Sequence, residues 1–98
     1  MALKEGTKHD AQKPRWSLLP TVAIQAVIGV LEYGAQKYAP ENWRKVENAR
    51  TRYYDAAMRH IHSWWLGEQI DAESGHHHLA HAICCLVFLL AVEVEDPR

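Results

Sequence analysis

The sequence has no long hydrophobic run and almost no net charge. Its longest apolar stretch, residues 82–92, holds eleven residues, which is too short to cross a bilayer and instead predicts a buried core helix. The N-terminal residues have neither the apolar core nor the cleavage site of a signal peptide. A formal net charge of −1 gives no global field to attract a membrane or a nucleic acid polymer. We therefore expect a cytoplasmic protein that binds neither.

Cysteine is scarce, and several catalytic signatures are missing. The two cysteines, Cys84 and Cys85, are neighbours in the apolar run. On a helix they point about 100° apart, so we expect free buried thiols and no disulfide between them. The chain contains no glycine-rich phosphate loop, serine triad signature or Cys/His nucleophile pair. Phosphate binding must therefore depend on a local cluster of lysine and arginine.

What is present predicts one all-α domain. Residues 1–16 lack periodicity and read as an extended N-terminal arm, whereas residues 17–98 form a single domain. Helical spacing of apolar residues predicts three main helices, over 17–38, about 48–66 and about 76–93. The first is apolar on most sides, which predicts burial between neighbours. The third is apolar all round, which places it at the centre of a small bundle or in a seam between copies, so we expect a dimer or tetramer.

The stretch "GEQIDAESGHHHLAHA", residues 67–82, combines carboxylates and imidazoles. Glu68 and Asp71 are three residues apart and lie just before the turn. His78 and His81 are three residues apart and His77 and His81 are four apart, so either histidine pair can share one helical face. An antiparallel hairpin would bring His60 to the same opening. Carboxylate and imidazole together suit a divalent ion such as Mg²⁺, Mn²⁺ or Co²⁺. The alternative is a set of polar helix ends, with His81 a hydrogen-bonded core histidine.

A second group combines basic and aromatic residues. Cations hold phosphates and flat rings stack on a base, so this combination suits a nucleotide. The alternative is a solvated basic face beside core aromatics. The candidate nucleotide-binding residues are Lys13, Arg15, Trp16, Lys37, Tyr38, Asn42, Trp43 and Arg59.

The ordered series "DAQKPRWSLLP", "YGAQKY", "NWR", "RH", "GEQIDAESG" and "HLAHA" resembles the phage-type dATP/dGTP diphosphohydrolase N-terminal family, from about Asp10 to Leu90. The resemblance implies a phage or prophage protein in the host cytoplasm. It also implies kinship with the MazG-like all-α pyrophosphohydrolases, which form oligomeric helix bundles. Those enzymes use carboxylate-bound Mg²⁺ or Mn²⁺ to cleave between the α- and β-phosphates. For this chain the implied reaction converts a purine nucleotide, dGTP or dATP, to the monophosphate and pyrophosphate.

The resemblance also carries residue roles. Glu68 and Asp71 match the second acidic pair of the MazG-like pattern, but the first acidic pair is missing, because Ala35 follows Glu32 and Met58 follows Asp55 at the expected spacing. We expect histidines to complete the metal shell, so the candidate ligands are Glu68, Asp71, His60, His78 and His81. The candidate catalytic residues are Glu68, Asp71 and Glu73, with Glu73 as general base through a water molecule.

The missing acidic pair motivates a rival hypothesis. A phage protein with such a pocket could sequester a host defence signalling nucleotide without turnover. A third hypothesis is a purely structural helical oligomer that binds neither nucleotide nor metal. Recovery of the ligand unchanged, or no binding at all, would distinguish these two from an enzyme.

Overall fold

The computed structural model describes residues 5–96 and consists of helices joined by loops. The three main helices are α1 (Thr21–Lys37), α2 (Ala49–Trp65) and α3 (His78–Glu95). Two short 3-10 helices, η1 (Trp16–Leu18) and η2 (Asn42–Lys45), precede α1 and α2. The described residues contain no strand, only an isolated bridge between Ile70 and His77. The predicted all-α class is confirmed.

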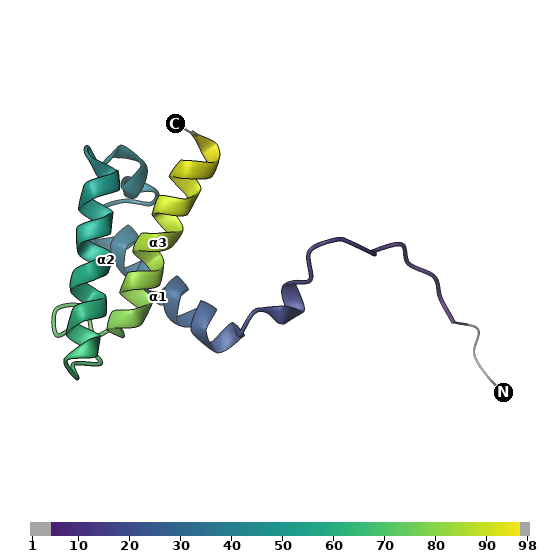
Figure 1. Ribbon diagram of the computed structural model, residues 1–98, viewed down its shortest axis with the longest axis horizontal. Helices are drawn as coiled ribbons and strands as arrows, with labels where there is room; N and C mark the ends of the chain where they lie inside the picture. The colour runs from purple at the N-terminus through teal and green to yellow at the C-terminus, as the bar shows by residue number, and fades with distance from the viewer. Residues whose placement is uncertain (1–4, 97–98) are drawn as a thin grey trace.

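The segment before the helices is exposed and extended. Residues 5–15 lie in no helix or strand, and Figure 1 shows them running away from the bundle. The chain measures 59 Å along its longest axis with a radius of gyration of 18.0 Å, against about 13 Å for a compact chain of about 100 residues. The N-terminal arm was expected over residues 1–16, of which residues 1–4 lie outside the described part.

Proline, glycine and histidine set the helix ends. The first helix begins at Thr21 and not at residue 17, because a proline disfavours helical backbone in the preceding residue and Leu19 is extended (φ −72°, ψ 132°). Gly67 follows α2 with φ 105°, which is the expected C-terminal glycine. Serine is a common helix cap, but Ser74, in the loop before α3, does not cap this helix. His77 caps it instead, through Nδ1, which accepts a hydrogen bond from the Leu79 amide at 3.0 Å.

The bundle is held by one small core. α2 and α3 pack along each other and α1 packs against α3, as Figure 1 shows. Val27 and Val30 of α1 bury themselves against Ala80 and Cys84 of α3, with Phe88 partly buried beside them. The side chains on α3 are small here, so the two helices can approach closely. This contact positions the start of α3, where the candidate site lies.

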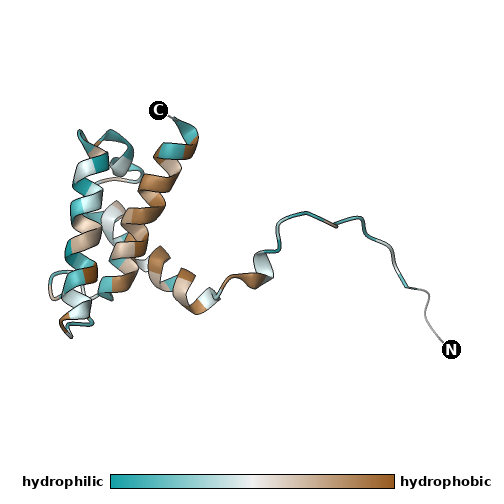
Figure 2. Cartoon of the chain, in the orientation of Figure 1, coloured by the Kyte–Doolittle hydropathy of each residue, from teal (hydrophilic) through white to brown (hydrophobic). Residues whose placement is uncertain are grey.

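Much of the apolar surface stays uncovered within one chain. On α1 only Val27 and Val30 are buried, whereas Val22 is 77% exposed. The prediction that the first helix is buried between neighbours is therefore wrong for the single chain. α3 does contact both other helices, but Leu90 is 65% exposed and Figure 2 shows an apolar band along this helix.

The third helix passes a length-and-composition test for crossing a membrane. Its 18 residues have a mean hydropathy of 1.8, and 28% of this segment is buried inside the protein. The core helices of soluble proteins meet the same criterion. This helix packs against α1 and α2 and carries His78 and His81 at its start, so the test gives only weak evidence for insertion.

Candidate functional site

The site is built on the loop between α2 and α3, which folds back on itself. The Asp71 amide donates to the His76 carbonyl at 2.8 Å, and the Gly75 amide donates to the Asp71 carbonyl at 2.8 Å. Gly75 adopts φ 76°, a conformation that favours glycine. The Ser74 amide donates to Asp71 Oδ2 at 2.9 Å, which fixes the orientation of that carboxylate.

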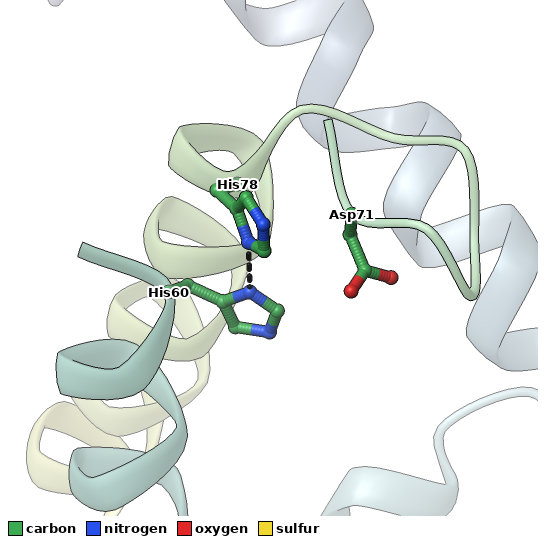
Figure 3. A group of neighbouring side chains, drawn as sticks. All are labelled: His60, Asp71 and His78. Atoms are coloured by element: carbon green, nitrogen blue, oxygen red, sulfur yellow. Dashed lines mark hydrogen bonds between the residues drawn. The ribbon is translucent and has the colours of Figure 1, made fainter. Parts of the chain in front are cut away.

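Three side chains from three elements meet beside this loop. His60 comes from α2, Asp71 from the loop and His78 from the first turn of α3, and one ligand atom of each lies within 4.8 Å of the others. The two Nδ1 atoms of the histidines are 2.8 Å apart. Figure 3 shows the two rings meeting through one nitrogen each, with the Asp71 carboxylate beside them. This donor set, two imidazoles and one carboxylate, is one that can hold a divalent ion.

His81 borders this group without joining it. Its ring stacks on the His60 ring with the centroids 4.4 Å apart and the planes within 7°. Its Nε2 lies 2.6 Å from Ser74 Oγ and 3.8 Å from Asp71 Oδ2. Within residues 5–96, the group whose ligand atoms lie within 4.8 Å of one another contains His60, Asp71 and His78. His81 lies next to this group and has Ser74 as its hydrogen-bond partner.

Burial and hydrogen bonding set the charge of the site. Burial, and then the neighbouring His78, lower the pKa of His60. Burial, and then His60, lower the pKa of His81 to about 4. Burial alone would raise the pKa of Asp71, but hydrogen bonds from Ser74 outweigh it and the pKa is lowered. At neutral pH His60 and His81 are therefore neutral beside an ionised Asp71, and neutral imidazole and ionised carboxylate are the protonation states that bind metals.

The two candidate glutamates lie on different sides of the cluster. Glu68 Oε1 is 3.0 Å from His78 Nε2, on the ring nitrogen that faces away from His60. Glu73 Oε1 accepts a hydrogen bond from Lys37 Nζ at 2.7 Å. That bond, and then Tyr38, raise the pKa of Lys37. Both glutamate side chains are largely exposed, although each is held by its partner, His78 for Glu68 and Lys37 for Glu73.

One cavity joins this cluster to the basic and aromatic residues. Its volume is about 690 Å³, and His60, Asp71, Glu73 and His81 line one part of it. A volume of this size lies within the range of small-molecule sites. Five of the eight residues predicted to bind nucleotide line the same cavity, namely Lys37, Tyr38, Asn42, Trp43 and Arg59.

The remaining three candidates lie elsewhere. Lys13, Arg15 and Trp16 sit on or next to the N-terminal arm and are exposed, with Trp16 76% exposed. They do not line the cavity. The structure thus brings together the candidates from the helices and η2, and leaves those from the arm apart.

Trp43 forms part of the cavity wall. Its ring stacks on Phe88 with centroids 4.7 Å apart and an interplanar angle of 9°, and the Arg44 guanidinium lies 4.3 Å from its centroid. Arg44 also bonds Glu95 at 2.7 Å, which ties η2 to the end of α3. The predicted base-stacking ring therefore already has an aromatic partner.

Sequence reasoning missed three lining or supporting residues. Tyr53 and Phe88 line the cavity with their rings edge to face, 5.2 Å apart. Tyr53 precedes His60 by two helical turns, so helical spacing was a signal for it. Ser74, which bonds both Asp71 and His81, stands inside the acidic and histidine stretch but was not among the candidates.

The two cysteines behave as expected. Cys84 and Cys85 are free and buried. Burial raises the pKa of both thiols, that of Cys84 to about 12. Both lie against the cavity as apolar lining and not as nucleophiles.

Comparison with known proteins identifies relatives of this chain. A family model described as "dATP/dGTP diphosphohydrolase, N-terminal" matches residues 4–98. The chain is also similar to a dATP/dGTP diphosphohydrolase from Salmonella phage PMBT28, with 37% identity over 86 residues. That alignment covers 86% of this chain but only 28% of the phage protein. No solved structure matches the chain with significance.

Proposed function

Because the chain belongs to the dATP/dGTP diphosphohydrolase N-terminal family, we propose that it hydrolyses a purine deoxynucleoside triphosphate, with the help of a divalent metal ion. In the proposed reaction water attacks the α-phosphorus and the bond to the α–β bridging oxygen breaks. A nucleoside monophosphate and pyrophosphate leave, and the attacking water loses a proton. We place the reaction in the host cytoplasm.

The observation that carries this proposal is the shared cavity. The imidazoles of His60 and His81 and the Asp71 carboxylate line one space of about 690 Å³ together with the basic residues Lys37 and Arg59. Hydrolysis of a triphosphate needs basic residues and a metal site, because the cations neutralise its charge while a metal ion would polarise the reacting phosphate. The aromatic part of the same space, at Tyr38 and Tyr53, offers apolar ring surface for a purine.

The residues present fit a metal ion. His60, His78 and Asp71 supply two imidazole nitrogens and a carboxylate oxygen within 4.8 Å of one another, and His60 and Asp71 carry lowered pKa values that keep them in ligand form. Mn²⁺ or Co²⁺ suits such a donor set, and Mg²⁺ is the expectation from the wider resemblance. A bound ion would polarise the phosphates and lower the pKa of water.

In our proposal the two members of the Lys37–Glu73 ion pair both take part in the reaction, Lys37 by binding phosphate and Glu73 by accepting a proton. Both side chains are substantially exposed, and exposed ion pairs contribute little stability, so a phosphate can replace Glu73 as the partner of Lys37. In our proposal Glu73, once released at the edge of the cavity, accepts a proton from the attacking water. In this scheme substrate binding itself frees the general base.

The test is a product analysis. Purified protein with Mn²⁺ is incubated with the four dNTPs and GTP, and every nucleotide and phosphate product is quantified chromatographically. We expect catalytic release of dGMP or dAMP with one equivalent of pyrophosphate. Asp71→Asn should lower the rate at least about 100-fold, because it removes a charged ligand from the site.

The matched control is Asp96→Asn at the exposed end of α3, which should keep the wild-type rate. Release of orthophosphate or of tripolyphosphate would contradict the proposed bond cleavage. Quantitative recovery of intact nucleotide would contradict turnover itself and favour sequestration.

A further inference from the structure

Glu68, His78 and His60 form a continuous chain of contacts. Glu68 Oε1 lies 3.0 Å from His78 Nε2, and His78 Nδ1 lies 2.8 Å from His60 Nδ1. A carboxylate oxygen can only accept a hydrogen bond, so His78 Nε2 carries the proton. A neutral His78 then has its lone pair on Nδ1, aimed at His60. His78 is buried, with a side chain only 5% exposed, which restricts its ring to this orientation.

The spacing of the two Nδ1 atoms matches a shared ion. Two nitrogen ligands at about 2.1 Å from one ion lie about 3 Å apart at an angle of about 90° and about 3.4 Å apart at the tetrahedral angle. The observed 2.8 Å separation is close to the first value. Without an ion, one of the two nitrogens carries a hydrogen and donates a hydrogen bond to the other. When an ion binds both nitrogens, the proton of His60 has only to move from Nδ1 to Nε2.

We propose that His60 and His78 bind the ion through their Nδ1 atoms, with Asp71 as the third ligand, and that Glu68 is a positioning residue and not a ligand. The His78 ring stands between Glu68 and the convergent nitrogens, so Glu68 reaches the metal site only through that ring. Glu68 fixes the tautomer and orientation of His78, as carboxylates do behind metal-bound histidines. This inference deepens the metal requirement of the proposed function and rests on it.

The same geometry selects a class of metal. Two of the three ligands are imidazoles, which suit borderline transition ions, whereas Mg²⁺ prefers oxygen ligands and retains its water. The site should therefore prefer Co²⁺, Mn²⁺ or Zn²⁺ over Mg²⁺. Displacement of bound Co²⁺ by an equal concentration of Mg²⁺ would overturn this assignment.

The first test measures metal affinity without nucleotide. Co²⁺ is titrated into wild-type protein, Glu68→Ala and Glu68→Gln, and followed by visible absorption. We expect Glu68→Ala to weaken binding about 10- to 100-fold while leaving the shape of the absorption band unchanged, because the ligand set is intact. Glu68→Gln should weaken it less, because an amide oxygen still accepts the His78 Nε2 proton.

The matched control is Glu47→Gln, an exposed carboxylate in the loop before α2, which should bind Co²⁺ like wild type. Wild-type affinity in Glu68→Ala would overturn the positioning role. A changed absorption band or complete loss of binding in a folded variant would make Glu68 a ligand and would also overturn it.

A second measurement needs no variant. Nitrogen-15 NMR of the wild-type histidines reports which ring nitrogen is protonated and which binds metal. We expect His78 to be protonated at Nε2 in both states and to bind Zn²⁺ through Nδ1. Binding through Nε2 would overturn the inference. Failure of wild-type protein to bind any metal would overturn it together with the metal requirement, whereas bound metal without hydrolysis would refute only the proposed function.

Discussion

At the residue scale, the three consecutive histidines, His76, His77 and His78, make different contacts. The His76 ring packs edge to face on Tyr33, with centroids 5.8 Å apart. His77 caps α3, and His78 meets His60 in the cluster. Each role follows from which ring nitrogen meets a donor or an acceptor, and the backbone of the loop decides that. A run of identical residues thus yields three unlike sites.

The lowered pKa of His81 predicts loss of stability in mild acid. Its pKa falls from an ordinary 6.5 in the unfolded chain to about 4 in the fold, so the unfolded state binds more protons between these values. Stability is therefore complete above pH 6.5 and is lost as the pH falls toward 4. Uptake of one extra proton by the unfolded state lowers the free energy of unfolding by at most about 1.4 kcal/mol per pH unit. Urea unfolding of metal-free protein across this pH range measures the slope.

A variant isolates this contribution. His81→Gln cannot take up a proton, so its stability should depend less steeply on pH between 6.5 and 4 than that of wild type. His9→Gln, in the exposed arm, is the matched control and should keep the wild-type slope. Equal slopes in wild type and His81→Gln would contradict the prediction.

At the element scale, η2 is attached to the C-terminal half of α3 by an aromatic contact and an ion pair. Trp43 stacks on Phe88, and the exposed Arg44–Glu95 pair adds orientation. This contact closes the aromatic end of the cavity. The loop after α1 is therefore part of the site wall, although it contains no long helix.

Trp43→Ala should open this wall and destabilise the fold. The lost burial and stacking predict a decrease of about 2 kcal/mol in the free energy of unfolding. In a domain of this size that lowers Tm by roughly 10 °C. Trp65→Ala is the control: Trp65 is 75% exposed, so its loss should change stability by less than about 0.5 kcal/mol. Thermal unfolding of both variants checks this, and equal Tm decreases would contradict it.

Gly29 shows how closely another element approaches the loop. A Cβ added at this position would lie 3.2 Å from His76 Cε1. The lack of a side chain at Gly29 therefore lets the backbone of α1 lie close to the His76 ring of the loop. Nothing lies within 4 Å of the corresponding position at Gly34. The first glycine of α1 is thus explained by a close contact and the second is not.

At the scale of the whole molecule, the apolar surface exceeds what one chain covers. Ile83, Leu86, Val87, Leu90 and Val94 are exposed and recur at three- and four-residue intervals, so they form one stripe along α3. Exposed apolar stripes of this kind mark association surfaces. We therefore propose that the protein is a dimer or tetramer whose copies meet along this stripe.

Light scattering coupled to size-exclusion chromatography tests the assembly. Wild type should elute as a dimer or tetramer, and Leu90→Glu should shift it toward monomer by placing a charge in the seam. Leu66→Glu is the control, because Leu66 is exposed at the end of α2, off the stripe, and should leave the assembly intact. A monomeric wild type at high micromolar concentration would contradict the proposal.

The sequence by itself determined the all-α class, the three helices and the region of the site. Apolar periodicity is a local property, and Pro20 and Gly67 act on their own backbone, so these features need no knowledge of distant contacts. The acidic and histidine residues gather within one short stretch, and the antiparallel hairpin correctly brought His60 to them. The metal and catalytic roles themselves remain predictions.

Only the tertiary structure decided what each side chain meets. It placed Glu68 behind the His78 ring, joined Glu73 to Lys37, and stacked Trp43 on Phe88. It also left most of α1 exposed and the arm residues away from the cavity. Spacing along a helix predicts which residues share a face. It does not predict which side chains lie opposite that face, or which ring nitrogen of a histidine points toward them. Those depend on how the separate helices and loops pack, because burial and hydrogen-bond satisfaction are properties of the whole fold.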